Sequence, residues 1–162
     1  MAVEYEKPFQ AFRFLVEIEG ARGAVVAAFS QFSGVNMTVE TVESRAGSDG
    51  RGVRQIIPVL TRFEPVTLTK GVVGDNAFLD WLFSAVAGPE AGPRSDEAVR
   101  RTLNVVALDD RGRRGVIWSL KNALPVGYSL SPMDGGRSEV LAESLTFAIT
   151  GMERKVNPPA AQ

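Results

Sequence analysis

The chain has 162 residues, of which 44% are hydrophobic and 23% are charged, a composition typical of one globular domain. Its 18 Lys and Arg nearly balance 19 Asp and Glu, so a net charge of -1 gives no long-range field that would attract nucleic acid or an anionic membrane. The sequence contains no Cys and no His. These absences exclude disulfides, Cys-based zinc sites and every catalytic pair that needs a thiolate or an imidazole.

The sequence predicts neither a targeting segment nor a membrane anchor. The N-terminus carries acidic residues where a signal peptide has basic ones. The longest apolar run, residues 24–29, is far shorter than the roughly 18 residues that cross a bilayer. We therefore expect the protein to be made in the cytoplasm.

The first half of the chain alternates apolar and polar residues, as half-buried strands do. The predicted strands cover residues 12–18, 25–32, 35–42, 53–60 and 63–70. Pro58 and Pro65 confine the last two to sheet edges or strand starts. The apolar face of the first strand consists of Phe12, Phe14, Val16 and Ile18, and we expect the opposite face, with Arg13, Glu17 and Glu19, to be exposed.

A Gly-rich stretch over residues 44–52 is predicted to be an exposed loop. A phosphate-binding loop would need a Gly-Lys-Ser or Gly-Lys-Thr ending with a helix after it, and the sequence has neither here. The interpretation that we favour is a flexible hairpin tip that becomes ordered against a partner.

One amphipathic helix is predicted. Asp75 is a good N-cap residue, and Gly88-Pro89 ends the helical pattern. A linker rich in Gly, Pro and charge then extends to about residue 99. The apolar stripe that recurs at helical spacing consists of Phe78, Trp81, Leu82, Ala85 and Val86.

The second half of the chain again has the pattern of strands, which are predicted over residues 101–108, 115–121, 126–131 and 139–150. Asp109-Asp110-Arg111-Gly112 is a hairpin-type turn, and its two adjacent carboxylates are too few for a calcium loop. The predicted fold class is mainly β (α+β), an antiparallel β-barrel or two-sheet sandwich with one flanking α-helix. We expect a single domain over residues 1–152 and a flexible C-terminal tail over 153–162.

No catalytic, cofactor or metal site is predicted, and we do not expect an enzyme. The serines lack an activating base, because the chain has no His and no Ser-x-x-Lys motif. Trp81 lies on the helical stripe and Trp118 alternates with Val116 and Leu120. Both indoles are therefore predicted to be core residues and not a sugar-binding platform.

Glu143 falls on the same predicted strand face as Leu145 and Phe147, where an unpaired carboxylate is costly. We predict that it pairs with an Arg, within the subunit or across an interface; a catalytic carboxyl with a raised pKa is the alternative. The opposite face, from Val140 to Thr150, is small and mildly polar. Such a face suits a wide, wet space or a contact with another copy.

The order of several segments resembles the inner tail tube proteins of contractile phages and of phage-tail-like contractile injection systems. The resemblance covers roughly residues 9–152. It is based on the sequences over residues 12–18, 29–35, 63–71, 78–81, 118–125 and 139–147, which include Thr-Leu-Thr-Lys-Gly, a helix ending in Trp and Asn-Ala-Leu-Pro.

This resemblance implies a barrel similar to type VI secretion tube subunits, assembled as six-membered rings that stack into a hollow rod and conduct cargo. The implied partners are further copies of the chain, a contractile sheath protein, baseplate or spike-hub proteins, tube-terminating proteins and cargo in the lumen. The implied location is the bacterial cytoplasm, then the assembled particle, with no cofactor and no specific nucleic-acid site. The expected ring-stacking or subunit-interface residues are Arg45, Asp49, Arg51, Arg54 and Glu143.

Three alternatives remain open at this stage. One is a tube initiator near the baseplate, or the tube of a non-contractile tail. Another is a β-barrel enzyme or small-ligand binder, which requires a ligand-sized pocket. The last is a carbohydrate-binding module, which requires an exposed indole at Trp81 or Trp118.

Overall fold

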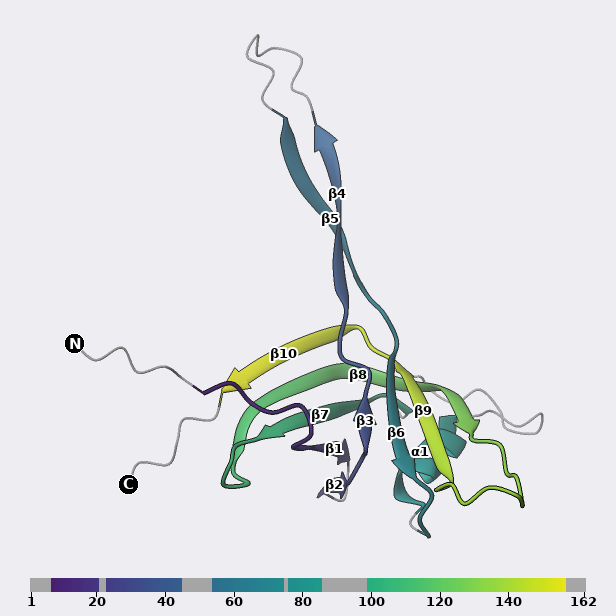
Figure 1. The fold of residues 1–162 in the computed structure, drawn as a ribbon. Coiled ribbons are helices and arrows are strands. Elements are labelled where there is room, and N and C mark those ends of the chain that lie inside the picture. Colours follow the sequence, from purple (N-terminus) through teal and green to yellow (C-terminus); the bar gives the residue numbers. More distant parts are fainter. Residues whose placement is uncertain (1–6, 21–22, 45–53, 75, 86–98, 157–162) are drawn as a thin grey trace.

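A computed structural model describes residues 7–20, 23–44, 54–74, 76–85 and 99–156 (Figure 1). The described chain is mainly β with one α-helix, and its strand pairs are antiparallel, which confirms the predicted fold class. The elements are β1 (Phe14–Gly20), β2 (Gly23–Ala27), β3 (Gln31–Phe32), β4 (Met37–Ser44), β5 (Gln55–Phe63), β6 (Val66–Gly71), α1 (Ala77–Ala85), β7 (Arg101–Leu108), β8 (Arg114–Leu130), β9 (Ala142–Ala148) and β10 (Gly151–Val156).

Two sheet regions share the long strand β8. The strand order is β2-β1-β7-β8-β9-β6-β3, and β10 also pairs with β8. The first half of β8 lies between β7 and β10, and we call this region sheet A. The second half pairs with β9, which continues the order to β6 and β3, and we call this region sheet B.

The prediction of two strands over 115–121 and 126–131 was wrong, because β8 is one strand of 17 residues. Asn122 has a φ of 52°, a left-handed conformation that Asn tolerates better than most residues. The register with β9 shifts between Pro125 and Gly127. These two irregularities bend the strand and turn it from sheet A into sheet B without ending it.

Helix α1 covers the apolar face of sheet B. Trp81 stacks on Phe147 of β9 with ring centroids 5.0 Å apart, and Phe78 meets Phe29 edge to face at 4.9 Å. Phe78, Trp81 and Leu82 are buried, which confirms the predicted helical stripe. The predicted N-cap Asp75, Val86 and most of the predicted linker lie outside the described residues.

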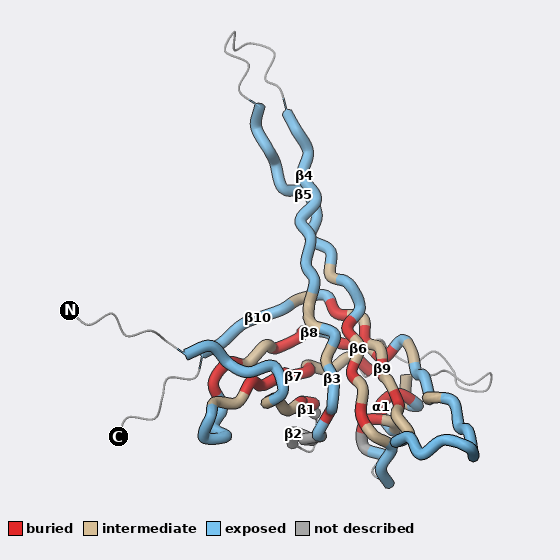
Figure 2. The backbone as a smooth tube through the Cα atoms, in the orientation of Figure 1, coloured by how far each residue is buried: buried red, intermediate tan, exposed pale blue. Residues whose placement is uncertain are grey.

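Strands β4 and β5 form a separate ribbon that extends away from the body of the molecule (Figures 1 and 2). Every residue of the two strands is exposed except Phe63 at the base, which is half-buried. Pro58 pairs with Thr41, beside the register shift between Glu40 and Thr41. Both strands of a two-stranded ribbon are edge strands, so the predicted edge position of Pro58 is confirmed. The β4–β5 ribbon therefore has no core of its own within the described chain.

Two sequence predictions near the ends of the described chain need correction. Phe12 was predicted on the inner face of the first strand, but it precedes β1 and is exposed. The expected tail over 153–162 starts too early, because β10 continues to Val156 and pairs with β8. Residues 157–162 lie outside the described residues. The predicted strand over 25–32 is divided between β2 and β3.

Candidate functional site

The described part of the chain contains no group of three or more Asp, Glu, His or Cys that could hold a metal ion. Among the described residues, no helix has the length and apolar character needed to cross a membrane. The surfaces that distinguish this molecule are instead an exposed ribbon, open sheet edges and one uncharged sheet face.

The β4–β5 ribbon combines exposed apolar side chains with charges that are paired inside the ribbon. The Arg62 guanidinium lies 2.7 Å from the Glu40 carboxylate, and Arg54 lies 3.6 Å from Glu43. The apolar side chains have no comparable partner, and exposed apolar surface of this kind marks interaction sites. They are Met37, Val39, Val42, Ile56, Ile57, Val59 and Leu60, with Ile56 67% exposed.

Three of the predicted interface residues, Arg45, Asp49 and Arg51, lie outside the described residues. Arg54 is described at the far end of the ribbon, paired with Glu43. Glu143 lies in the buried face of sheet B. The structure therefore does not bring Arg54 and Glu143 together in one site.

Sheet B has an open edge at each end within the described chain. Residues 124–130 of β8 pair with β9 on one side, while β7 and β10 pair only with the first half of β8. At the other end, β3 pairs with β6 alone. This edge of β8 carries three exposed side chains, those of Val126, Tyr128 and Leu130. Open strand edges of this kind pair readily with another chain.

The face of sheet B that points away from α1 is small, uncharged and rich in hydroxyl groups. The Thr69 and Ser144 hydroxyls lie 2.9 Å apart, and those of Thr67 and Thr146 lie 3.3 Å apart. These side chains are only half-buried, while their neighbours in sequence are buried on the α1 side. This confirms the predicted alternation of β9.

Glu143 is 3% exposed, and its partner is Lys70, which lies directly opposite on β6. The Lys70 Nζ lies 3.3 Å from Glu143 Oε1, and the Tyr128 hydroxyl donates to Oε2 at 3.2 Å. Loss of solvation raises the pKa of Tyr128, and the Glu143 carboxylate raises it further. The prediction of a pair was confirmed, but the prediction of an Arg was wrong.

On the polar face of β1, Glu19 is exposed as predicted, but Glu17 is buried. Glu17 is 5% exposed and pairs with Arg114, whose Nη1 donates to Oε2 at 3.1 Å. The next strands continue this row, since Ser119 donates to Asn104 at 2.7 Å and Asn104 donates to Glu19 at 2.8 Å. Sequence reasoning missed this row, because the strand order that aligns β1, β7 and β8 is not visible in any one segment.

A cavity of about 500 Å³ lies between the N-terminal segment and sheet A, and it is the feature that a small-ligand binder would require. Its walls are mainly apolar, and they include Phe9, Phe14, Val35, Trp118 and Met152. Trp118 also packs against the core cluster.

The prediction of a core indole was confirmed for Trp81, whereas Trp118 is only half-buried and lines the cavity. Trp81 is buried, and its Nε1 donates to the Val99 carbonyl at 2.6 Å. Trp118 is half-buried against the core. Trp81 therefore offers no exposed platform for a sugar.

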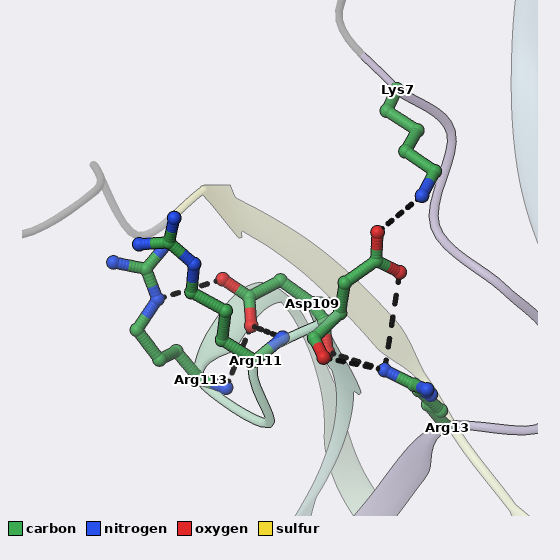
Figure 3. A network of polar contacts seen from close by, with 6 residues as sticks. Lys7, Arg13, Asp109, Arg111 and Arg113 are labelled. Atoms are coloured by element: carbon green, nitrogen blue, oxygen red, sulfur yellow. Dashed lines mark hydrogen bonds and ion pairs between the residues drawn. The ribbon is translucent and has the colours of Figure 1, made fainter.

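A charged network holds the N-terminal segment against the turn between β7 and β8 (Figure 3). Asp110 pairs with Lys7, and Arg13 donates to the Asp110 carbonyl at 2.8 Å. Asp109 accepts backbone hydrogen bonds from Arg111 and Arg113 across the turn. These contacts lower the pKa of both carboxyls: Arg113 is the main cause for Asp109, and Lys7 for Asp110.

We expect the N-terminal segment to loosen as the pH falls. The pKa of Asp110 lies below its ordinary value of 3.8 in the folded chain, so its stabilising contribution is complete above that pH and is lost as the carboxyl is protonated. Amide hydrogen exchange of residues 9–13, corrected for its intrinsic rate, should accelerate below this pH. Asp110→Asn should show the faster exchange already at about pH 5, while Asp134→Asn, a matched change at an exposed loop, should not. Equal exchange in all three proteins across this range would contradict the account.

Together these features define a mainly β chain that exposes an apolar ribbon and unpaired sheet edges, which are features typical of proteins that assemble with other chains. The sequence model of the T4-like virus tail tube protein gp19 family matches residues 10–153, and the chain belongs to this family of tail tube proteins. A comparison with curated proteins gives no match.

Solved structures support the same fold. The chain is 19% identical to a protein in the cryo-EM structure of the anti-feeding prophage (AFP) baseplate, with a TM-score of 0.76 over 93% of this chain and 97% of that one. It is 22% identical to a protein in the extended sheath-tube complex of the PVC extracellular contractile injection system, with a TM-score of 0.72 over 96% and 95% of the two chains. An Hcp protein is 11% identical, with a TM-score of 0.50 over 88% and 96%.

Proposed function

We propose that this tail tube protein is the main tube subunit of a contractile injection system or phage tail, and that it acts without catalysis. Copies form six-membered rings, and the rings stack into a hollow rod. The family match carries this proposal. The similar chains come from assemblies described as six-fold symmetrised, C6-symmetric or a sheath-tube complex, which supports six-membered rings and a surrounding sheath as partners.

The two open edges of sheet B suit ring closure. Residues 124–130 of one copy and β3 of the next present different unpaired edges, and such a heterologous contact repeated by rotation closes a ring. The uncharged hydroxyl face then lines the bore, because α1 occupies the other face of the sheet. A bore lined in this way attracts neither sign of charge in the cargo.

The β4–β5 ribbon suits contacts between rings. It extends beyond the body, and its exposed apolar side chains need cover. We also propose that Arg45, Asp49, Arg51 and Arg54 contact the adjacent ring, and that Glu143 stiffens the sheet that forms the ring. Deleting residues 47–52 should leave folded subunits that stack poorly. Rods of normal length from that deletion would contradict the proposal that Arg45, Asp49, Arg51 and Arg54 contact the adjacent ring.

A tube initiator at the baseplate is the second candidate, since one similar chain belongs to an AFP baseplate structure. Electron microscopy of the purified protein in negative stain tests both candidates. Long, smooth, hollow rods support the main tube subunit, whereas isolated rings or short stacks that end at a fixed height support the initiator. A protein that stays monomeric at high concentration contradicts both.

The proposed location follows from assembly. The protein is made in the bacterial cytoplasm and then becomes part of a tail or injection particle. Baseplate or hub proteins, a tube-terminating protein and cargo in the lumen complete the proposed partners; a similar chain occurs in an AFP tube-terminating cap structure.

A further inference from the structure

The cavity of about 500 Å³ beside sheet A is covered on one side by residues 9–13, which we call the strap (Figure 1). The Phe9 ring lies so close to Gly115 of β8 that a Cβ at residue 115 would overlap it. At the other end of the strap, the Leu108 amide donates to the Arg13 carbonyl at 2.9 Å. Both ends of the strap therefore contact sheet A, and the cavity between them is part of the fold.

The cavity wall is rich in aromatic side chains. Phe9 comes from the strap, Phe14 from β1, Phe32 from β3 and Trp118 from β8, and the thioether of Met152 on β10 lies among them. Phe14, Phe32 and Trp118 are only half-buried, although each also packs against the core. Aromatic rings and thioethers make favourable contacts with another ring, so a wall of this composition favours an aromatic ligand.

Arg13 is the one charged residue that lines this cavity within the described chain. Its side chain contacts the carbonyls of Asp109 and Asp110 and the Asp110 carboxylate, and its guanidinium carbon lies 5.3 Å from the Phe12 ring centroid (Figure 3). All the polar contacts use Nη1, which leaves Nε and Nη2 without a partner among the described residues. A guanidinium with two such donors suits a carboxylate or a sulfonate.

We propose that this cavity binds a small aromatic anion, with its ring against the aromatic wall and its acidic group at Arg13. The volume lies within the range of about 300–1,000 Å³ that is usual for ligand pockets. The charge at the wall is complementary to an anion, because no Asp or Glu of the described chain lines the cavity. This binding site goes beyond the proposed function and does not depend on it.

Two fluorescent probes test the site in dilute, full-length protein: anilinonaphthalene sulfonate, which is an aromatic anion, and its uncharged parent anilinonaphthalene. The wild-type chain should bind both saturably. Arg13→Gln keeps an amide donor for the Asp110 carbonyl but removes the charge. It should weaken binding of the sulfonate about tenfold and that of the parent by less than about twofold. An equal effect on the two probes, or no saturable binding by the wild-type chain, overturns the inference.

A second pair of variants locates the probes. Ala107→Phe places a ring inside the cavity and should abolish saturable binding of both probes while the circular dichroism spectrum stays that of the wild type. Ile57→Ser, which changes an exposed apolar side chain of the β4–β5 ribbon, should leave both affinities unchanged. Loss of binding in Ile57→Ser but not in Ala107→Phe would place the probes on the ribbon and overturn the site. If Ala107→Phe does not fold, the result with Arg13→Gln decides.

The occupant could also be a neighbouring copy of the chain, and assembly distinguishes this case. The sulfonate probe should stay bound when the wild-type protein is concentrated into rods. Its release on rod formation would show that another subunit fills the cavity, and this would overturn the inference while leaving the tube function standing. If no rods form, the proposed function fails, and the probe and variant results in dilute protein still decide the binding site.

Discussion

Replacing residues 38–62 with Asn-Gly is expected to give a folded subunit that forms no rods. Met37 and Phe63 lie opposite each other at the base of the ribbon, and Asn-Gly is the preferred two-residue connection between paired strands. The described residues of the removed segment, 38–44 and 54–62, include no buried side chain, so the core should persist and the Tm should change by only about a few degrees. Circular dichroism measures the fold, and electron microscopy measures the loss of rods.

A matched control keeps the ribbon and changes its polar surface. Thr38→Ser and Thr41→Ser alter exposed residues of β4 without altering its apolar side chains, and rods of wild-type length should result. Rods of normal length from the truncated subunit would show that stacking does not use the ribbon. An unfolded body would show instead that the ribbon is part of the fold.

Lys70→Met is expected to destabilise the subunit by about 3–5 kcal/mol, because it leaves the Glu143 carboxylate buried without its cation. Among the described residues, Glu143 would then retain only the hydrogen bond from Tyr128. Combining Lys70→Met with Glu143→Leu removes both charges, and most of the lost stability should return. Urea denaturation, carried out at protein concentrations too low for assembly, measures the free energy of unfolding of each variant.

The exposed pair between Lys121 and Glu153, 3.7 Å apart, is the control. Lys121→Met should cost no more than about 1 kcal/mol, since solvent screens an exposed pair. If Lys70→Met costs as little as this control, the buried pair does not stabilise the sheet. If the double variant is as unstable as the single one, the loss comes from packing and not from the unpaired charge.

Local periodicity made much of the fold predictable. The stripe of Phe78, Trp81 and Leu82 depends only on helical spacing, and the alternation of β9 depends only on the two faces of a strand. The continuity of β8 could not be predicted in this way. Asn122 and Pro125 interrupt its alternation, although Asn122 only changes φ and the register shift only bends the strand.

Features that depend on pairing between distant segments were less predictable. The burial of Glu143 followed from its own strand, but its partner depends on the register that places Lys70 opposite it. The edge strand β10 was missed because Glu153, Arg154 and Lys155 are exposed and show no apolar alternation. Its strand conformation comes from backbone pairing with β8.

A cryo-EM reconstruction of the particles formed by the purified full-length chain tests most directly whether the molecule is completed by its own copies. The account predicts hollow rods in which sheet B joins that of the neighbouring subunit around the bore, with Thr69 and Ser144 facing the lumen and the β4–β5 ribbon reaching the next layer. Particles in which the residue 124–130 edge and the ribbon both remain in solvent would contradict it.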